Sequence, residues 1–162
     1  MNPSPWIGVI GAGRCSAEEA EVAVQVGRLL AEQGMPVLCG GLGGVMSAVA
    51  RGVKEKGGLV VGVLPGSRPD QGNEFLSLTL ATGLGEARNL VIVHSAAVLI
   101  AIAGEYGTLS EIAFARKAGK TVISLGSWPQ IPGLWAADSP EHAVELVRQA
   151  LQKSCRSDST SA

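Results

Sequence analysis

The sequence predicts an α/β fold, a three-layer sandwich in which a mostly parallel sheet of about six or seven strands lies between helices. Two observations predict it. Apolar runs of strand length alternate along the chain with stretches of helical periodicity, which is typical of parallel sheets. Most of the 22 glycines lie at the ends of these runs. With 162 residues, 46% of them hydrophobic, the chain can bury one core of the Rossmann-like type.

The expected strands are apolar runs bounded by glycine, proline or polar residues. Ala97–Ala103 contains no polar residue, so this strand is expected to be buried on both faces of the sheet. In Phe75–Thr82 leucine alternates with smaller or polar residues, the period of a strand with one exposed face. In chain order, the strands are expected at Trp6–Ile10, Pro36–Cys39, Leu59–Leu64, Phe75–Thr82, Ala97–Ala103 and Thr121–Leu125.

The expected helices carry start and stop signals. Ser16 and Glu19 have the spacing of a capping box, and so do Thr108 and Glu111. Ser139 precedes a proline, which is a common start for a helix. The helices are expected from Ser16 to Gly34, from about Val45 to Lys56, from Glu86 to about Ser95, from Thr108 to Ala118, and from Ser139 to near Gln152.

Two stretches are expected to be loops, the polar Ser67–Asn73 and Gly126–Asp138, which holds two tryptophans and two prolines. The chain ends in SCRSDSTSA, a small and polar segment. We therefore expect one domain over residues 1–152 and a disordered tail over residues 153–162.

Composition and charge exclude several classes of protein. The formal net charge of -1 gives no general electrostatic reason to bind nucleic acid or an anionic membrane. No apolar run approaches the roughly 18 residues of a membrane span, and the N-terminus has no signal-peptide pattern. The three cysteines have no CxxC spacing, so neither a zinc site nor a disulfide framework is expected. These observations favour a cytoplasmic protein without a metal site.

Glycine turns follow the expected strands at their carboxyl ends, where parallel α/β folds bind ligands. A strand that leads through such a turn into a helix aims backbone N–H groups and the positive end of the helix dipole at one point. An anion, most often a phosphate, suits this point, although the glycines could also serve tight turns alone. The candidate phosphate-binding or nucleotide-binding residues are Gly11 and Gly13 in the first turn, Gly40, Gly41, Gly43, Gly44 and Met46 in the second, and Gly104, Glu105, Tyr106, Gly107 and Thr108 in the third.

Known nucleotide-binding fingerprints fit these turns only in part. Gly11 and Gly13 match the GxG half of the dinucleotide fingerprint, but Ser16 stands where the third glycine belongs. No acidic residue closes the second strand, and the Walker pattern is absent, so binding of NAD or FAD is not expected. Arg14 beside the first turn could reach an anion, although a solvated arginine side chain is an equally good interpretation.

Three segments carry a resemblance to a known family: GGLGGVM at Gly40–Met46, EARNLVI at Glu86–Ile92 and GEYGTLSEI at Gly104–Ile112. In this order and spacing they resemble the LONELY GUY family of cytokinin riboside 5'-monophosphate phosphoribohydrolases. They resemble still more its short bacterial relatives, which are grouped with molybdenum cofactor carrier proteins. The resemblance covers about Trp6–Leu151. It implies a phosphorylated ligand of nucleotide or molybdopterin type, and a homodimer or a higher homo-oligomer.

The resemblance also implies roles for two residues. The PGGxGTxxE motif of the phosphoribohydrolase branch is met at Gly104, Gly107, Thr108 and Glu111, and the arginine of that branch falls on Arg88. The arginine and the final glutamate are the catalytic pair there, and they need no cofactor. From the residues alone, Glu111 could instead cap its helix, and Arg88 could be an ordinary surface side chain.

The chain departs from this pattern near the third turn. Ala103 replaces the proline of the motif, Glu105 replaces its second glycine, and Asn89 replaces the basic residue after the arginine. A glutamate at position 105 adds negative charge beside the proposed phosphate and hinders its close approach. Two functions therefore compete. We favour a carrier or sensor that binds its ligand; the alternative, which Arg88 and Glu111 favour, is a phosphoribohydrolase that releases a base from a nucleoside 5'-monophosphate.

Overall fold

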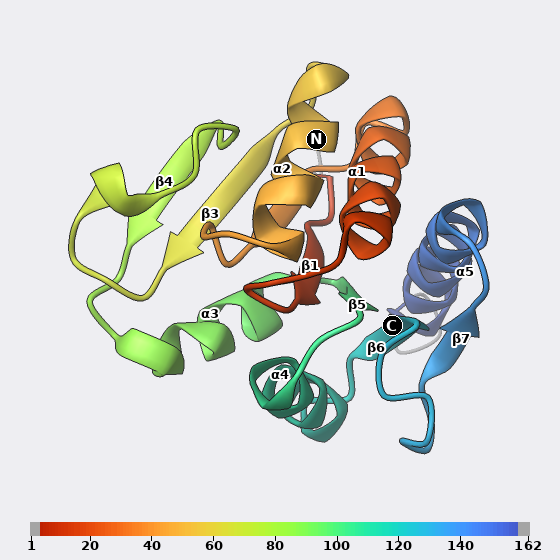
Figure 1. Cartoon of the computed structure of the whole chain (residues 1–162). Helices are drawn as coiled ribbons and strands as arrows, with labels where there is room; N and C mark the ends of the chain where they lie inside the picture. The colour runs from red at the N-terminus through yellow and green to blue at the C-terminus, as the bar shows by residue number, and fades with distance from the viewer. Residues whose placement is uncertain (1–3, 159–162) are drawn as a thin grey trace.

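The computed structural model describes residues 4–158, which form one seven-stranded sheet with helices on both faces (Figure 1). The strands are β1 (Ile7–Gly11), β2 (Val37–Cys39), β3 (Val60–Leu64), β4 (Leu78–Ala81), β5 (Val98–Ile102), β6 (Thr121–Leu125) and β7 (Trp135–Ala137). All neighbouring strands are parallel, in the order β4-β3-β2-β1-β5-β6-β7. The predicted Rossmann-like α/β fold is confirmed.

Helices connect the strands and cover the two faces of the sheet. Within residues 4–158 they are α1 (Ala17–Glu32), α2 (Val45–Glu55), α3 (Arg88–Ser95), α4 (Tyr106–Lys117) and α5 (Pro140–Asp158), with short 3-10 turns at Pro69–Gln71 and Gly85–Ala87. Helices α1, α2 and α5 lie on one face, and α3 and α4 lie on the other (Figure 1). None of these helices is long and apolar enough to cross a membrane.

The winding of the sheet reverses at β1. Strands β2, β3 and β4 add on one side of β1, whereas β5, β6 and β7 add on its other side. Helix α2, which follows β2, and helix α4, which follows β5, therefore cover opposite faces. Such a reversal leaves a crevice beyond the carboxyl ends of the strands, which is where open α/β sheets bind ligands.

Two apolar clusters form the core, one on each face of the sheet. In β1, Ile7 and Val9 belong to the cluster under α1, α2 and α5, and Ile10 belongs to the cluster under α3 and α4. Every residue of β5 is buried, as its uninterrupted apolar run predicts. Burying an aliphatic side chain of this size stabilises the fold by roughly 1.5–3 kcal/mol.

Helices α1 and α2 cross closely because each has a glycine at the crossing. A Cβ atom on Gly27 would lie 3.0 Å from the backbone nitrogen of Val53, in α2. A Cβ atom on Gly52 would lie 3.0 Å from the backbone nitrogen of Arg28, in α1. These separations are shorter than any ordinary carbon contact, so the close approach of the two helices requires both glycines.

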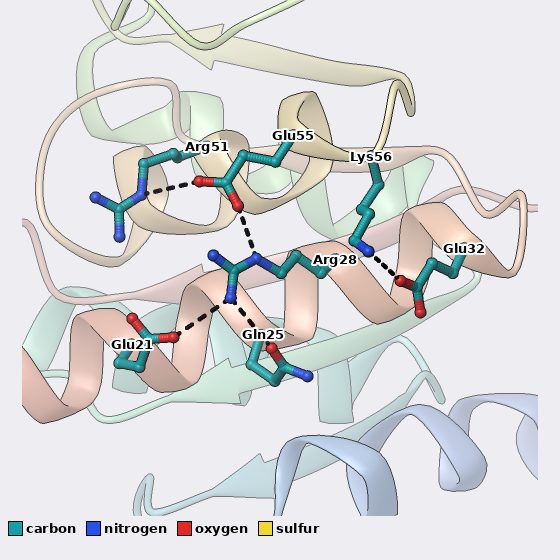
Figure 2. Close-up of polar contacts among 7 residues, drawn as sticks. All are labelled: Glu21, Gln25, Arg28, Glu32, Arg51, Glu55 and Lys56. Carbon is teal, nitrogen blue, oxygen red and sulfur yellow. Dashed lines mark hydrogen bonds and ion pairs between the residues drawn. The ribbon is translucent and has the colours of Figure 1, made fainter.

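Charged side chains link the same two helices on their exposed side (Figure 2). Arg28 Nε lies 2.7 Å from Glu55 Oε2, and Arg51 Nε lies 3.8 Å from the other oxygen of Glu55. Lys56 Nζ lies 2.7 Å from Glu32 Oε1. Exposed ion pairs contribute roughly 0–1 kcal/mol each, so their main effect is to give this surface a charged, solvated character.

The edges of the sheet differ from the sequence prediction. Trp135–Ala137 forms β7 inside the expected loop, because it pairs in parallel register with Ile123–Leu125. At the opposite edge, β4 covers only Leu78–Ala81, the central part of the expected strand at Phe75–Thr82. Both edge strands are short, and pairing with a neighbour defines them more than their own sequence does.

Two helix ends also differ from the prediction. Helix α4 begins at Tyr106, with Glu105 as its N-cap, so Thr108 lies inside the helix and does not cap it. Helix α5 continues beyond Gln152 to Asp158, and residues 153–158 of the expected tail are therefore helical. The rest of that tail, residues 159–162, lies outside the described residues.

Candidate functional site

A cleft with a volume of about 730 Å³ opens at the carboxyl ends of the central strands. Its walls come from the glycine turns after β1, β2 and β5 and from the start of α3. The lining residues are Ile10, Gly11, Ala12, Gly13, Arg14, Gly40, Leu42, Met46, Pro65, Glu86, Arg88, Asn89, Glu105, Gly107, Thr108 and Glu111.

Nine of the predicted site residues line this cleft: Gly11, Gly13, Gly40, Met46, Arg88, Glu105, Gly107, Thr108 and Glu111. Five others do not. Gly41, Gly44 and Gly104 have φ angles of 76°, 62° and 107°, so these glycines shape the turns behind the lining. Gly43 lies in the second turn between them. Tyr106 is 81% exposed and faces Trp128, with the two ring centroids 6.1 Å apart.

The first turn is fixed against the start of α2. Val45 N donates a hydrogen bond to Ala12 O across 3.0 Å. A Cβ on Gly11 would lie 2.6 Å from Val45 Cγ1, so only glycine allows this approach. Gly13 faces open space instead, because the nearest atom to a Cβ there would be Met46 Cε, at 4.0 Å. The turn is therefore packed behind and open in front.

The second turn starts α2 without a side-chain cap. The N-cap is Gly44, which has no side chain to accept from the first-turn amides. Asn73, from the loop after β3, fixes the turn: its backbone nitrogen donates to Gly41 O across 2.9 Å and its Nδ2 donates to Leu42 O across 3.0 Å. Because these carbonyls face Asn73, the peptide N–H groups that follow them point the opposite way.

The third turn starts α4, again without a side-chain cap. Glu105 is the N-cap, and its carboxylate makes no hydrogen bond to the first turn of the helix. Thr108 is buried within the first turn, so the expected capping box of Thr108 and Glu111 is wrong. The N–H groups of Tyr106, Gly107 and Thr108 occupy the positions that an α-helix leaves without partners of its own.

The backbone before this turn accounts for one departure from the family motif. Ala103 has a φ angle of 48°, and Gly104 follows with 107°. A proline ring fixes φ near about −65°, so proline could not occupy this conformation of position 103. The alanine at position 103 is therefore compatible with the observed path from β5 into α4, and a proline is not. Glu105 lines the cleft, which places its negative charge beside the proposed phosphate.

Arg88 is buried at the floor of the cleft, with only 9% of its surface exposed. Its NH1 group donates to Gly40 O across 2.5 Å and also to Val63 O. Its Nε is buried and has no hydrogen-bond partner among residues 4–158. Burial lowers the pKa of the guanidinium, and the neighbouring Glu111 partly offsets this effect. The interpretation of Arg88 as an ordinary surface side chain is wrong.

Glu111 is the second buried charge at this floor, with 7% of its surface exposed. Burial raises the pKa of its carboxyl from 4.5 to about 7, although the positive charge of Arg88 opposes the shift. No hydrogen bond or ion pair to Glu111 occurs within the described chain. A carboxyl group with this pKa can hold or release a proton near neutral pH, as acid and base catalysis requires.

Several lining residues were not expected from the sequence. Glu86 and Asn89 flank Arg88 at the start of α3, so their place in the EARN segment is the signal that could have found them. Leu42 lies within the second glycine turn, and Pro65 directly follows β3. Arg14, which the sequence leaves open between an anion contact and a solvated side chain, lines the cleft as well.

Comparison with known proteins places this cleft in a family context. Residues 4–155 match the model of the SLOG cluster4 family. An uncharacterized protein of Archaeoglobus fulgidus is 51% identical over 138 residues, which cover 85% of this chain and 91% of that protein. A probable cytokinin riboside 5'-monophosphate phosphoribohydrolase of Oryza sativa subsp. japonica is 39% identical over 93 residues, or 56% of this chain and 38% of that protein.

Solved structures resemble the chain over nearly its whole length. The molybdenum cofactor binding protein of Rippkaea orientalis has a TM-score of 0.88 and 35% identity, covering 92% of this chain and 98% of that one. The Moco carrier protein of Chlamydomonas reinhardtii has a TM-score of 0.86 and 34% identity, and the match covers 93% of this chain and 99% of that one. DNA processing protein A of Streptococcus pneumoniae shares the fold alone. It has a TM-score of 0.64 and 18% identity, and the match covers 88% of this chain and 56% of that one.

Proposed function

The chain belongs to the SLOG cluster4 family, in the LOG-like superfamily close to molybdenum cofactor carrier proteins, and we propose that it binds a phosphorylated small molecule of molybdopterin or nucleotide type as a carrier or sensor. One observation carries this proposal: α2 and α4 both begin at one cleft, and neither has a side-chain cap. Helix α1, in contrast, is capped by Ser16. Free N–H groups at two helix starts favour a doubly charged anion such as a phosphate.

The size and shape of the cleft support such a ligand. Its volume of about 730 Å³ is within the range of roughly 300–1,000 Å³ that small-molecule sites occupy. A Cβ on Gly107 would meet no atom within 4 Å, so the backbone there leaves room for a ligand group. The relatives from Rippkaea orientalis and Chlamydomonas reinhardtii, a molybdenum cofactor binding protein and a Moco carrier protein, support a pterin-type ligand.

The third turn favours carriage over catalysis. Ala103, whose positive φ excludes the proline of the motif, and Glu105, which lines the cleft, both depart from the motif of the phosphoribohydrolase branch. A carrier needs a site that holds its ligand and releases it intact, and negative charge beside the phosphate limits how tightly the ligand is held. We therefore propose binding as the primary role of the cleft.

The substitution Gly107→Asp tests this role. It places a carboxylate in the open space at the start of α4, at a helix position where aspartate favours folding. One like charge at about 4 Å costs about 1–4 kcal/mol, so retention of molybdenum cofactor should fall by roughly fivefold or more. Retention is measured as the pterin fluorescence that co-elutes with the protein after gel filtration and oxidation.

Ala17→Asp is the matched control. It introduces the same residue into the first turn of α1, which Ser16 already caps and which does not line the cleft. This variant should retain the cofactor as the unmodified protein does. Equal retention by Gly107→Asp and Ala17→Asp would contradict binding at the third turn, and no retention by the unmodified protein would contradict the carrier role.

A second function, phosphoribohydrolase activity, is favoured by the two buried charges at the floor of the cleft. Cleavage of an N-glycosidic bond passes through an oxocarbenium-like transition state, which a carboxylate stabilises, and it needs a base to activate water. Glu111, with its pKa of about 7, could act in either way. Arg88 would stabilise the ionised form of Glu111 beside it.

Release of free base distinguishes the two functions. The protein is incubated with AMP and a panel of other nucleoside monophosphates, and free base is followed by chromatography. Release that Glu111→Gln abolishes would establish the phosphoribohydrolase. Binding of phosphorylated ligands with no release of base would support the carrier or sensor.

A further inference from the structure

The guanidinium of Arg88 is already engaged by the protein. Its NH1 group donates to Gly40 O and Val63 O, at the ends of β2 and β3. Its Nε is buried beneath the cleft surface. Moving the guanidinium toward a ligand would take NH1 away from two backbone carbonyls that it now satisfies, and an unsatisfied buried acceptor is costly. Arg88 is therefore anchored to the floor of the cleft through NH1.

Arg14 is the opposite case. It lines the same cleft, its side chain is exposed, and it makes no hydrogen bond or ion pair with any other residue from 4 to 158. The backbone on both sides of it is fixed. Before it, Ala12 O accepts from Val45 N, and after it Ser16 forms a capping box with Glu19. A rigid turn thus presents a free cationic side chain next to Gly13, which faces open space.

The charges of the cleft make this side chain decisive for an anionic ligand. Glu86, Glu105 and Glu111 supply three carboxylates to the lining, and Arg88 and Arg14 supply the positive charges. No lysine or histidine is among the lining residues of the described chain. Because the NH1 group of Arg88 is engaged by backbone carbonyls, Arg14 is the cation on these walls that no residue from 4 to 158 holds in place.

We propose that Arg14 binds the phosphate of the ligand, while Arg88 is a positioning residue that holds the floor of the cleft. This inference rests on the function proposed above and names the residue that binds the charged group of the ligand. The planar fork of an arginine can donate two parallel hydrogen bonds to phosphate oxygens. The helix starts at α2 and α4 supply the remaining donors, and Arg14 closes over the phosphate from the first turn.

The test compares AMP with adenosine, which differ only in the phosphate. Dissociation constants for both are measured by isothermal titration on the unmodified protein and on Arg14→Gln, Arg14→Lys and Arg51→Gln. Arg51 is the matched control because its exposed side chain on α2 carries the same charge outside the cleft. Arg14→Gln should weaken AMP binding by roughly 10–100-fold, the range for a hydrogen bond to a charged group, and leave adenosine binding unchanged.

The conservative variant separates charge from geometry. Arg14→Lys keeps the charge but loses the fork, so its affinity for AMP should lie between those of the unmodified protein and Arg14→Gln. If the unmodified protein binds AMP no better than adenosine, the phosphate-binding function fails, and the role of Arg14 fails with it. If the unmodified protein prefers AMP and Arg14→Gln keeps that preference as Arg51→Gln does, the function stands and the role of Arg14 is refuted.

Discussion

Glu111 has a carboxyl group whose pKa burial raises into the neutral range. Its pKa rises from 4.5 to about 7, so between these values the folded protein keeps a proton that the unfolded chain releases. The free energy of unfolding therefore falls as the pH rises through this window. A shift of this size corresponds to on the order of 3 kcal/mol. The buried carboxylate thus makes the folded protein less stable at pH 8 than at pH 5.

We expect Glu111→Gln to remove this pH dependence. Glutamine has nearly the same volume and no charge to bury, so the variant should be more stable than the unmodified protein by about 1–3 kcal/mol at pH 8. The two proteins should converge below about pH 5. Urea denaturation at pH 5, 6, 7 and 8 measures the difference. Glu18→Gln, a substitution at an exposed glutamate, serves as the control. A difference in the free energy of unfolding between Glu111→Gln and the unmodified protein that stays constant with pH would contradict the raised pKa of Glu111.

Single residues of the site were predictable to different degrees. The glycine turns were recognisable because a conformational demand is local, as at Gly41 and Gly44, whose φ angles are positive. The burial of Arg88 was not, because it depends on carbonyls of Gly40 and Val63 that are distant along the chain. The spacing of Thr108 and Glu111 fits a capping box locally, but in the fold this spacing places both side chains at the cleft.

At the level of elements, the crossing of α1 and α2 is the most demanding contact. A Cβ on Gly52 would meet the carbonyl oxygen of Val24, and a Cβ on Gly27 would meet the carbonyl oxygen of Val49. Alanine favours a helix over glycine by about 1 kcal/mol, whereas overpacking of this kind costs typically 1–3 kcal/mol or more. Because backbone atoms on both helices would have to move, the steric cost wins.

We expect Gly52→Ala to lower the free energy of unfolding by about 2 kcal/mol or more, and Gly27→Ala to act in the same direction. Gly107→Ala is the matched control, since a Cβ there would meet no atom within 4 Å and alanine should be neutral or stabilising. Urea denaturation of the three variants at one pH provides the comparison. Stabilisation by Gly52→Ala would show that the helices do not cross as closely as described.

The elements that the sequence predicted well are those with long local patterns. The alternation of apolar runs and helical stretches located β1 to β6, α1 to α4 and the start of α5 to within a few residues. Strand β7 has only three residues, and its pairing with β6 rather than its own sequence defines it. The end of α5 was missed because a small, polar composition reports solvation and does not exclude a helix.

The two helical layers of the whole molecule have different outer surfaces. Over α1 and α2, ion pairs give a charged surface (Figure 2). On the other side, large apolar residues are exposed in β4, before α3 and in α4: Leu78, Leu80, Leu84, Tyr106 and Phe114. The register of β4 with β3 sets Leu78 beside Val61 and Leu80 beside Val63, on the face that α3 and α4 cover. Leu78 and Leu80 lie two positions apart in the edge strand β4, and exposed apolar side chains that lie together are typical of an interface.

We expect this second surface to join two copies of the chain, in line with the homo-oligomer that the family resemblance implies. Leu78 and Leu80 are 62% and 50% exposed, so replacing them should leave the monomer fold intact. The double variant Leu78→Glu, Leu80→Glu would bury like charges across a two-fold interface and should shift the protein from dimer to monomer. Ala17→Glu, at an exposed position at the start of α1 in the other helical layer, is the control. Sedimentation velocity measures the masses; a monomeric unmodified protein, or a double variant that stays dimeric, would contradict an interface on this surface.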